Sequence, residues 1–249
     1  MNRRRGSIAR AWWANPLVLL LQWPACAFAQ DAGPTPEARA LVYLTVEVPR
    51  WTEEHKCYSC HNNGDAARAL MAAVRSGDLT DRQPLADTLK FLAAPERWDE
   101  NGPDGPFKDK KLARIQFAAA LVDANKAGLL MDRQALEKSA RSIAALQMPD
   151  GSWETDAPGS VGSPATYGRF LATWMGRRTL AAGDAAKSRA AIEKTDQWFE
   201  QARVVSVLDA AATLWALAES TTPAATQQRQ RCLKLIRDGR SSEGAGAQL

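Results

Sequence analysis

Leu79-Thr80-Asp81-Arg82-Gln83-Pro84-Leu85 recurs 51 residues later as Leu130-Met131-Asp132-Arg133-Gln134-Ala135-Leu136. In each copy an aspartate stands where its carboxylate can cap a following helix. The same offset aligns Ala69-Leu70 with Ala120-Leu121, and Asp99 with Asp150. A period of this size is typical of paired helices stacked as repeats, because a single pair cannot bury its apolar face alone.

The rest of the chain also favours helices. The alternation typical of strands is nearly absent, and alanine-rich stretches recur with helical spacing. Helices are expected near residues 66–74, 115–124, 136–146, 170–179 and 208–218, with third and fourth helix pairs near 165–198 and 208–236. The predicted fold class is therefore all-α, an array of repeated helix pairs over residues 65–240 followed by a disordered tail at 241–249.

One short motif carries the functional prediction. Cys57-Tyr58-Ser59-Cys60-His61 has the C-x-x-C-H spacing of covalent haem c attachment. One helical turn would separate the two cysteines, and the histidine follows directly, so all three side chains can meet one macrocycle. We expect residues 51–64 to form a haem attachment segment that leads into the first helix pair. Cys57 and Cys60 would bond to one haem, and His61 would be the proximal iron ligand.

Other interpretations of the motif explain less. A Cys57–Cys60 disulfide suits an oxidising compartment but does not account for His61. His55 could join Cys57, Cys60 and His61 as a zinc ligand, but all four lie within one short segment. Structural zinc sites usually join two separated ligand pairs.

The distal iron ligand is left open by the sequence. Met148 is the distal candidate because Met148-Pro149 falls in an expected turn. His55, Met131 and Met175 are weaker candidates, and Met71 falls on an apolar helix face that predicts a core position. A five-coordinate iron would favour ligand sensing or redox catalysis over simple electron transfer.

The N-terminus predicts export. An arginine-rich start precedes the apolar run Trp12–Trp23, and Ala27-Phe28-Ala29 has the pattern of a signal-peptidase site. We expect a signal peptide at residues 1–29 cleaved near Ala29, a linker at 30–50 and a periplasmic or otherwise exported protein. No later stretch is apolar for long enough to predict a transmembrane anchor. A lipoprotein anchored at Cys26 would need a better lipobox than Trp23-Pro24-Ala25.

Charge argues against one class of partner. The chain has 32 basic and 28 acidic side chains, and residues 1–29 hold four arginines and no acid. The expected mature protein is thus close to neutral, which predicts no nucleic-acid partner. Cys232 would remain as a lone cysteine, expected to be a small buried apolar residue.

A turn motif carries a family resemblance. Leu146-Gln147-Met148-Pro149-Asp150-Gly151-Ser152-Trp153 resembles the QW repeat of the squalene-hopene cyclase and protein prenyltransferase superfamily, and residues 237–244 resemble a degraded second copy. The resemblance implies that Gln147 ties the turn to a helix N-terminus, Gly151 allows the turn and Trp153 packs over it. It also implies a partial α/α-toroid. With the haem motif, the chain resembles exported bacterial proteins that place C-x-x-C-H ahead of cyclase-like repeats.

The sequence lacks the catalytic groups of that superfamily. The D-x-D-D acid of the cyclases is missing, since neither Asp99–Asp104 nor Asp196-Gln197-Trp198 matches it. The prenyltransferase zinc ligands are missing too, because His55 and His61 are the only histidines. Catalysis of either type is therefore not expected. About four helix pairs would leave an open array, so self-association through its end is expected.

The predicted function is an exported protein with one covalent haem c that acts in electron transfer or redox and ligand sensing, together with a redox partner protein. Two alternatives stay open: a helical-repeat ligand-binding or scaffolding protein with structural haem, and a degenerate terpenoid cyclase-like enzyme. The recurring tryptophans are expected to pack in the core and in turns. As an alternative, Trp51 and Tyr58 would cover the haem face, and Trp174 and Trp215 would line a central apolar cavity that could hold a terpenoid or lipid.

Overall fold

The computed structural model describes residues 33–59, 64–100, 110–154 and 168–239. These ranges contain helices and no strand, which confirms the all-α fold class. The chain divides into two compact units, Met1–Thr35 and Pro36–Leu249, and the helices of the described residues lie in the second. The predicted signal peptide, Cys26, Cys60, His61 and the tail at 241–249 lie outside the described residues.

The helices of the second unit follow the expected order. They are α1 (Pro36–His55), α2 (Ala66–Ser76), α3 (Ala86–Leu92), α4 (Lys110–Lys126), α5 (Gln134–Ala144), α6 (Gly168–Asp184), α7 (Arg189–Gln201), α8 (Val207–Ala216) and α9 (Pro223–Asp238). Short 3₁₀ helices η2 (Gln83–Leu85) and η3 (Pro95–Glu100) flank α3. Each helix expected from the alanine-rich stretches is present, within the boundary error usual for such predictions.

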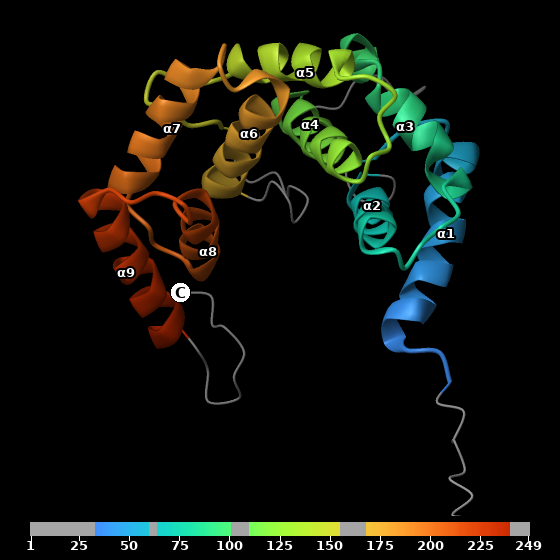
Figure 1. The fold of residues 1–249 in the computed structure, drawn as a ribbon, viewed down its shortest axis with the longest axis horizontal. Helices are drawn as coiled ribbons and strands as arrows, with labels where there is room; N and C mark the ends of the chain where they lie inside the picture. The colour runs from blue at the N-terminus through green and yellow to red at the C-terminus, as the bar shows by residue number, and fades with distance from the viewer. Residues whose placement is uncertain (1–32, 60–63, 101–109, 155–167, 240–249) are drawn as a thin grey trace, which may run out of the picture. The chain divides into compact units, whose positions relative to one another are not determined.

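The even-numbered helices form one row and the odd-numbered helices pack outside it (Figure 1). Along the first row α2 contacts α4, α4 contacts α6 and α6 contacts α8. The helices α3, α5, α7 and α9 each pack against members of that row, and α1 packs against α2 and α3. Alternate helices in the chain are therefore neighbours in space, which is how stacked helix pairs bury their apolar faces.

Helix α4 lies at the centre of this packing. Eleven of its 17 residues are buried, including Phe117, Leu121 and the polar Gln116. A helix that is buried on nearly every side needs neighbours all round it. Those neighbours are α2, α3, α5 and α6.

The 51-residue repeat gives the same local structure twice. Asp81 Oδ1 accepts a hydrogen bond from the backbone N–H of Gln83 at 2.9 Å, and Asp132 Oδ1 accepts one from Gln134 at 2.8 Å. Both aspartates therefore satisfy a backbone donor at the start of a helical segment, as the sequence predicts. Leu85 and Leu136, which follow at matching positions, are both fully buried.

Residues 36–50 are not a linker, so that expectation was wrong. They form most of α1, whose Leu41, Leu44 and Val48 pack onto the hydrophobic core. The spacing of these three residues places them on one helix face. Pro49 lies inside the helix, and α1 continues beyond it to His55.

Three residues hold the turn after α5. Gln147 Nε2 donates to Gly151 O, to Ala191 O at 2.9 Å and to Thr195 Oγ1 at 2.9 Å, and so ties the turn to α7. Gly151 has φ +96°, and a Cβ there would stand 2.5 Å from Lys194 O, so only glycine fits. Trp153 is fully buried and donates from Nε1 to Ile143 O at 2.8 Å.

Gly176 on α6 is the surface against which Trp153 packs. A Cβ at Gly176 would stand 2.7 Å from the Trp153 ring. We expect Gly176→Ala to lower the free energy of unfolding by about 1–3 kcal/mol, because the buried indole has no room to move. Urea unfolding followed by circular dichroism measures this.

Gly33→Ala is the control for this substitution. A Cβ at Gly33 meets nothing within 4 Å, so its stability should change by no more than about 0.5 kcal/mol. Equal unfolding midpoints for the two variants would contradict the close packing of Gly176 on Trp153.

Candidate functional site

Cys57 follows directly on the end of α1. Lys56 adopts φ +54°, and its N–H donates to Thr52 O at 2.9 Å, so the chain leaves the helix there. The Cys57 side chain is partly exposed. Cys57, Tyr58 and Ser59 lie outside the helices, so the described part of the motif does not form the expected helical turn.

Tyr58 anchors this segment to α3. Its ring stacks on Phe91 with centroids 3.9 Å apart and 7° between planes, and its hydroxyl donates to Asp87 O at 2.9 Å. Burial, and next the Asp87 carboxylate, raise the pKa of Tyr58 above its usual value. Tyr58 is thus fixed against the protein, which leaves its neighbour Cys57 at a defined place on the surface.

Ser59 and Gly64 lie next to each other on either side of residues 60–63. A Cβ on Gly64 would stand 2.9 Å from Ser59 O. Asp65 follows, and its Oδ1 accepts from Gln116 Nε2 at 2.7 Å. Both ends of the predicted haem segment are therefore attached to the core, at α3 and at α4. Cys60 and His61 themselves lie outside the described residues.

His55 is engaged with its own helix. Its ring stacks on Trp51 with centroids 3.8 Å apart, and its Nδ1 lies 3.2 Å from Trp51 O. Within the described ranges there is no group of three or more His, Cys, Asp or Glu side chains that could hold a metal ion. The alternative zinc set contains two of the residues outside these ranges.

The methionines occupy four different settings. Met71 is in the core at 1% exposure, as predicted, and Met131 is fully exposed. Met148 lies in the turn after α5, where its N–H donates to Ser152 O at 2.8 Å. Met175 on α6 lines a pocket and accepts a hydrogen bond from Arg178 Nη1 at 3.2 Å.

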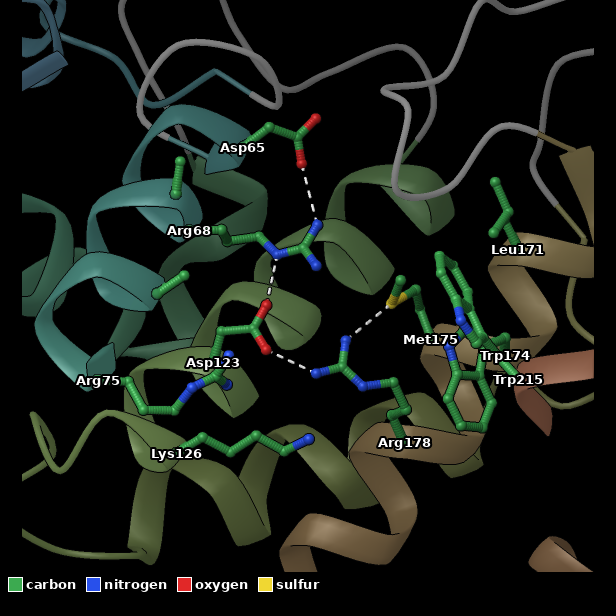
Figure 2. Close-up of a pocket in the computed structure, with 12 residues that line it drawn as sticks. Asp65, Arg68, Arg75, Asp123, Lys126, Leu171, Trp174, Met175, Arg178 and Trp215 are labelled. Carbon is green, nitrogen blue, oxygen red and sulfur yellow. Dashed lines mark hydrogen bonds and ion pairs between the residues drawn. The ribbon is translucent and has the colours of Figure 1, made fainter. Parts of the chain in front are cut away.

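That pocket is lined by both charged and aromatic side chains (Figure 2). Its volume is about 790 Å³, and its walls come from α2, α4, α6 and α8. Its lining residues are Asp65, Arg68, Ala69, Ala72, Arg75, Asp123, Lys126, Leu171, Trp174, Met175, Arg178 and Trp215. We call it the inner pocket.

Asp123 stands at the centre of its charged wall. Its Oδ2 accepts from Arg68 Nε and its Oδ1 from Arg178 Nη2, each at 2.6 Å (Figure 2). Burial alone would raise the pKa of Asp123, but the charges of Arg178 and Arg68 and their hydrogen bonds outweigh it, so the pKa is lowered. The carboxylate is therefore ionised at neutral pH and joins α2, α4 and α6.

The spacing of these three residues is a signal that sequence reasoning missed. Arg68, Asp123 and Arg178 are each 55 residues apart, one on each of three successive helices of the first row. Positive, negative and positive side chains at this interval would have predicted ion pairs between neighbouring helices of the row. The sequence reasoning followed the period of 51 and did not examine this second interval.

The helix ends help to place two other lining residues. α2 ends at Gly77, whose φ of +88° lets its N–H donate to Val74 O, and this leaves Arg75 in the last turn. α8 begins with a capping box in which Ser206 Oγ accepts from Asp209 N at 3.1 Å and Asp209 Oδ2 accepts from Ser206 N at 3.2 Å. The cap sets the register that brings Trp215 to the pocket.

Trp174 and Trp215 line this pocket together, with Leu171 and Met175 beside them. The facing wall carries charged side chains, which the sequence interpretation did not include. The charged positions of α2 and α4 face the same space.

No family model, curated protein or solved structure matches this chain. In the described ranges no helix has the length and apolar character needed to cross a bilayer.

Asp123 should be important for stability. We expect Asp123→Asn to lower the free energy of unfolding at neutral pH by roughly 1.5–3 kcal/mol, the range for hydrogen bonds to charged groups. Because its folded-state pKa is lowered, this contribution is complete above the unfolded pKa of about 4 and is lost as pH falls through the folded value. Urea unfolding between pH of about 7 and about 3 should show the two proteins converging in acid.

Asp238→Asn is the matched control. Asp238 pairs with Lys234 on the surface of α9, where an ion pair contributes about 0–1 kcal/mol. If Asp123→Asn were no more destabilising than Asp238→Asn, the central role of Asp123 would be refuted.

Proposed function

We propose that this chain is an exported protein that carries one covalent haem c on Cys57 and Cys60, with His61 as the proximal iron ligand. The observation that carries the proposal is the C-x-x-C-H motif at residues 57–61 behind an export-type leader. Covalent haem attachment requires access to the cysteine sulfur atoms, and Cys57 is partly exposed. A haem bound there would supply a one-electron couple at its iron and, with an open sixth position, a site for a small ligand.

The surroundings of Cys57 fit such a group. Ser59 and Gly64 are adjacent, so the segment between them starts and ends at one place on the core. Trp51 Nε1 is buried and finds no acceptor among the described residues. A buried donor left unpaired in a protein interior is unusual and favours an additional partner at this end of α1. Trp51 and Tyr58 would then shield one side of the attachment site.

We also propose that the helix array is a partial α/α-toroid of the cyclase type. Its support is the two-row arrangement and the turn after α5, which Gln147 and Gly151 hold against α7 and Trp153 holds against α6. The chain lacks the catalytic aspartates and zinc ligands of that superfamily, so the role we propose for it is that of a binding or redox protein. An experimental structure whose rows do not superimpose on a cyclase repeat would overturn this part.

Exposed apolar side chains support self-association. Val42, Tyr43 and Val46 are exposed on α1, and Val205, Leu208 and Leu233 are exposed near α8 and α9. These are the first and last helices of the second unit, where an open array leaves apolar surface uncovered. Sedimentation over a range of concentrations tests this, and a monomer at every concentration would overturn it.

Haem attachment is tested by removing the thiols. Cys57→Ala with Cys60→Ala should abolish covalent haem, because no thioether bond can form. The protein is expressed with its leader in a host that has the cytochrome c maturation machinery. Intact mass, haem staining on a denaturing gel and the visible spectrum on reduction measure attachment.

Cys232→Ala is the control for the thiol substitutions. Cys232 is fully buried in α9, and burial raises the pKa of its thiol, so it is unreactive and its loss should leave one haem per chain. Haem retained on a denaturing gel by the double variant would disprove the attachment sites.

Carbon monoxide distinguishes the two roles. A shift of the reduced Soret band on adding carbon monoxide would show an open sixth position and favour ligand sensing. An unchanged band would favour electron transfer with a bound distal side chain, and Met148→Ala would then test the predicted distal ligand.

A further inference from the structure

The inner pocket holds more positive than negative charge. Four cationic side chains line it, Arg68, Arg75, Lys126 and Arg178, against the carboxylates of Asp65 and Asp123. Arg68 is paired with both carboxylates and Arg178 with Asp123. Once these pairs are made, both carboxylates are already engaged with guanidinium groups.

Arg75 and Lys126 remain outside these pairs. Among the described residues neither is within ion-pair distance of a carboxylate. Burial, and next the charge of Arg178, lower the pKa of Lys126, while Asp123 only partly offsets them. Arg75 and Lys126 lie beside Arg178 and have no counter-ion of their own among the described residues. Their charges therefore raise the electrostatic potential of the pocket.

The opposite wall is aromatic. Trp174 and Trp215 lie together beside Leu171 and Met175 (Figure 2). Trp215 is 59% exposed although tryptophan is usually much more buried. A ligand placed against it would remove apolar surface from water, which is favourable in proportion to area.

The pocket has the size of a small-molecule site. Its volume of about 790 Å³ lies within the range of roughly 300–1,000 Å³ found for such sites. It also has the usual composition, a hydrophobic and aromatic wall with a few convergent polar groups.

We propose that the inner pocket binds an organic carboxylate whose head lies between Arg75 and Lys126 and whose flat apolar body packs on Trp174 and Trp215. Arginine and lysine both donate charge-assisted hydrogen bonds to carboxylates.

Two sources can supply this chemistry, a diffusible carboxylate or the propionates of the haem. The second source rests on the proposed function, because Asp65 at the edge of the pocket follows His61 by only four residues. The first does not depend on haem. The two arms of the experiment below separate them.

The first arm measures binding of 1-pyrenebutyrate to the mature protein by isothermal titration calorimetry, with the neutral 1-pyrenebutanol as the matched ligand. We expect one site per chain and at least about tenfold weaker binding of the alcohol, because a hydrogen-bonded charge is lost. Arg75→Gln with Lys126→Gln should weaken pyrenebutyrate binding about tenfold or more, and Trp215→Ala should weaken both ligands. Arg231→Gln, which removes a positive charge from the exposed surface of α9, is the surface control and should bind as the parent does.

The second arm measures the haem reduction potential of the same proteins. If the propionates fill the pocket, pyrenebutyrate will not bind, but Arg75→Gln with Lys126→Gln will lower the potential relative to Arg231→Gln, because loss of positive charge favours the oxidised iron. Either pattern supports the proposal. The proposal is overturned if the double substitution leaves pyrenebutyrate binding unchanged. It is also overturned if pyrenebutyrate does not bind and the haem reduction potential is unchanged. If no haem is attached, the calorimetric arm still decides, so failure of the proposed function is distinct from failure of this site.

Discussion

The carboxylate of Asp123, held between Arg68 and Arg178, is the interaction on which the inner row of helices depends. It joins α2, α4 and α6 through two hydrogen bonds of 2.6 Å. The three side chains are each only about 15% exposed, so water screens them weakly and the loss of one leaves the others without a counter-ion. The same ion pairs fix the charged wall of the inner pocket. Packing and binding thus share one set of residues.

Much of the fold was predictable because its signals are local. The aspartates at 81 and 132 and the alanine-rich periods indicated where helices begin and that they come in pairs. The geometry of the turn at 147–153 was predictable from its sequence, since Gly151 and Trp153 occupy positions that few other residues can fill. Helix α1 was missed because Pro49 and its β-branched neighbours suggest an irregular segment, and only tertiary contacts of Leu41, Leu44 and Val48 favour a helix there.

The site was less predictable than the fold. The proposed haem site at Cys57, Cys60 and His61 rests on spacing alone, because covalent attachment of a haem would restrict the sequence between them. The inner pocket needs side chains from four helices spread over 150 residues of chain. Trp174 and Trp215 were expected to share a cavity, but nothing near them in the sequence indicates Arg75 or Lys126. Only the tertiary structure shows that these charged residues lie in the same pocket as the tryptophans.

The central position of α4 has a consequence for the order in which the chain is made. Its Phe117 and Leu121 are covered by helices on both sides in sequence, and α5 and α6 follow it. During synthesis or passage through a membrane channel, α4 therefore emerges before half of its cover exists. Until residue 184 has appeared, a long apolar helix is open to other chains, which is the condition under which chaperones prevent aggregation. The protein completes its core late, and its earliest folded half is the one most in need of protection.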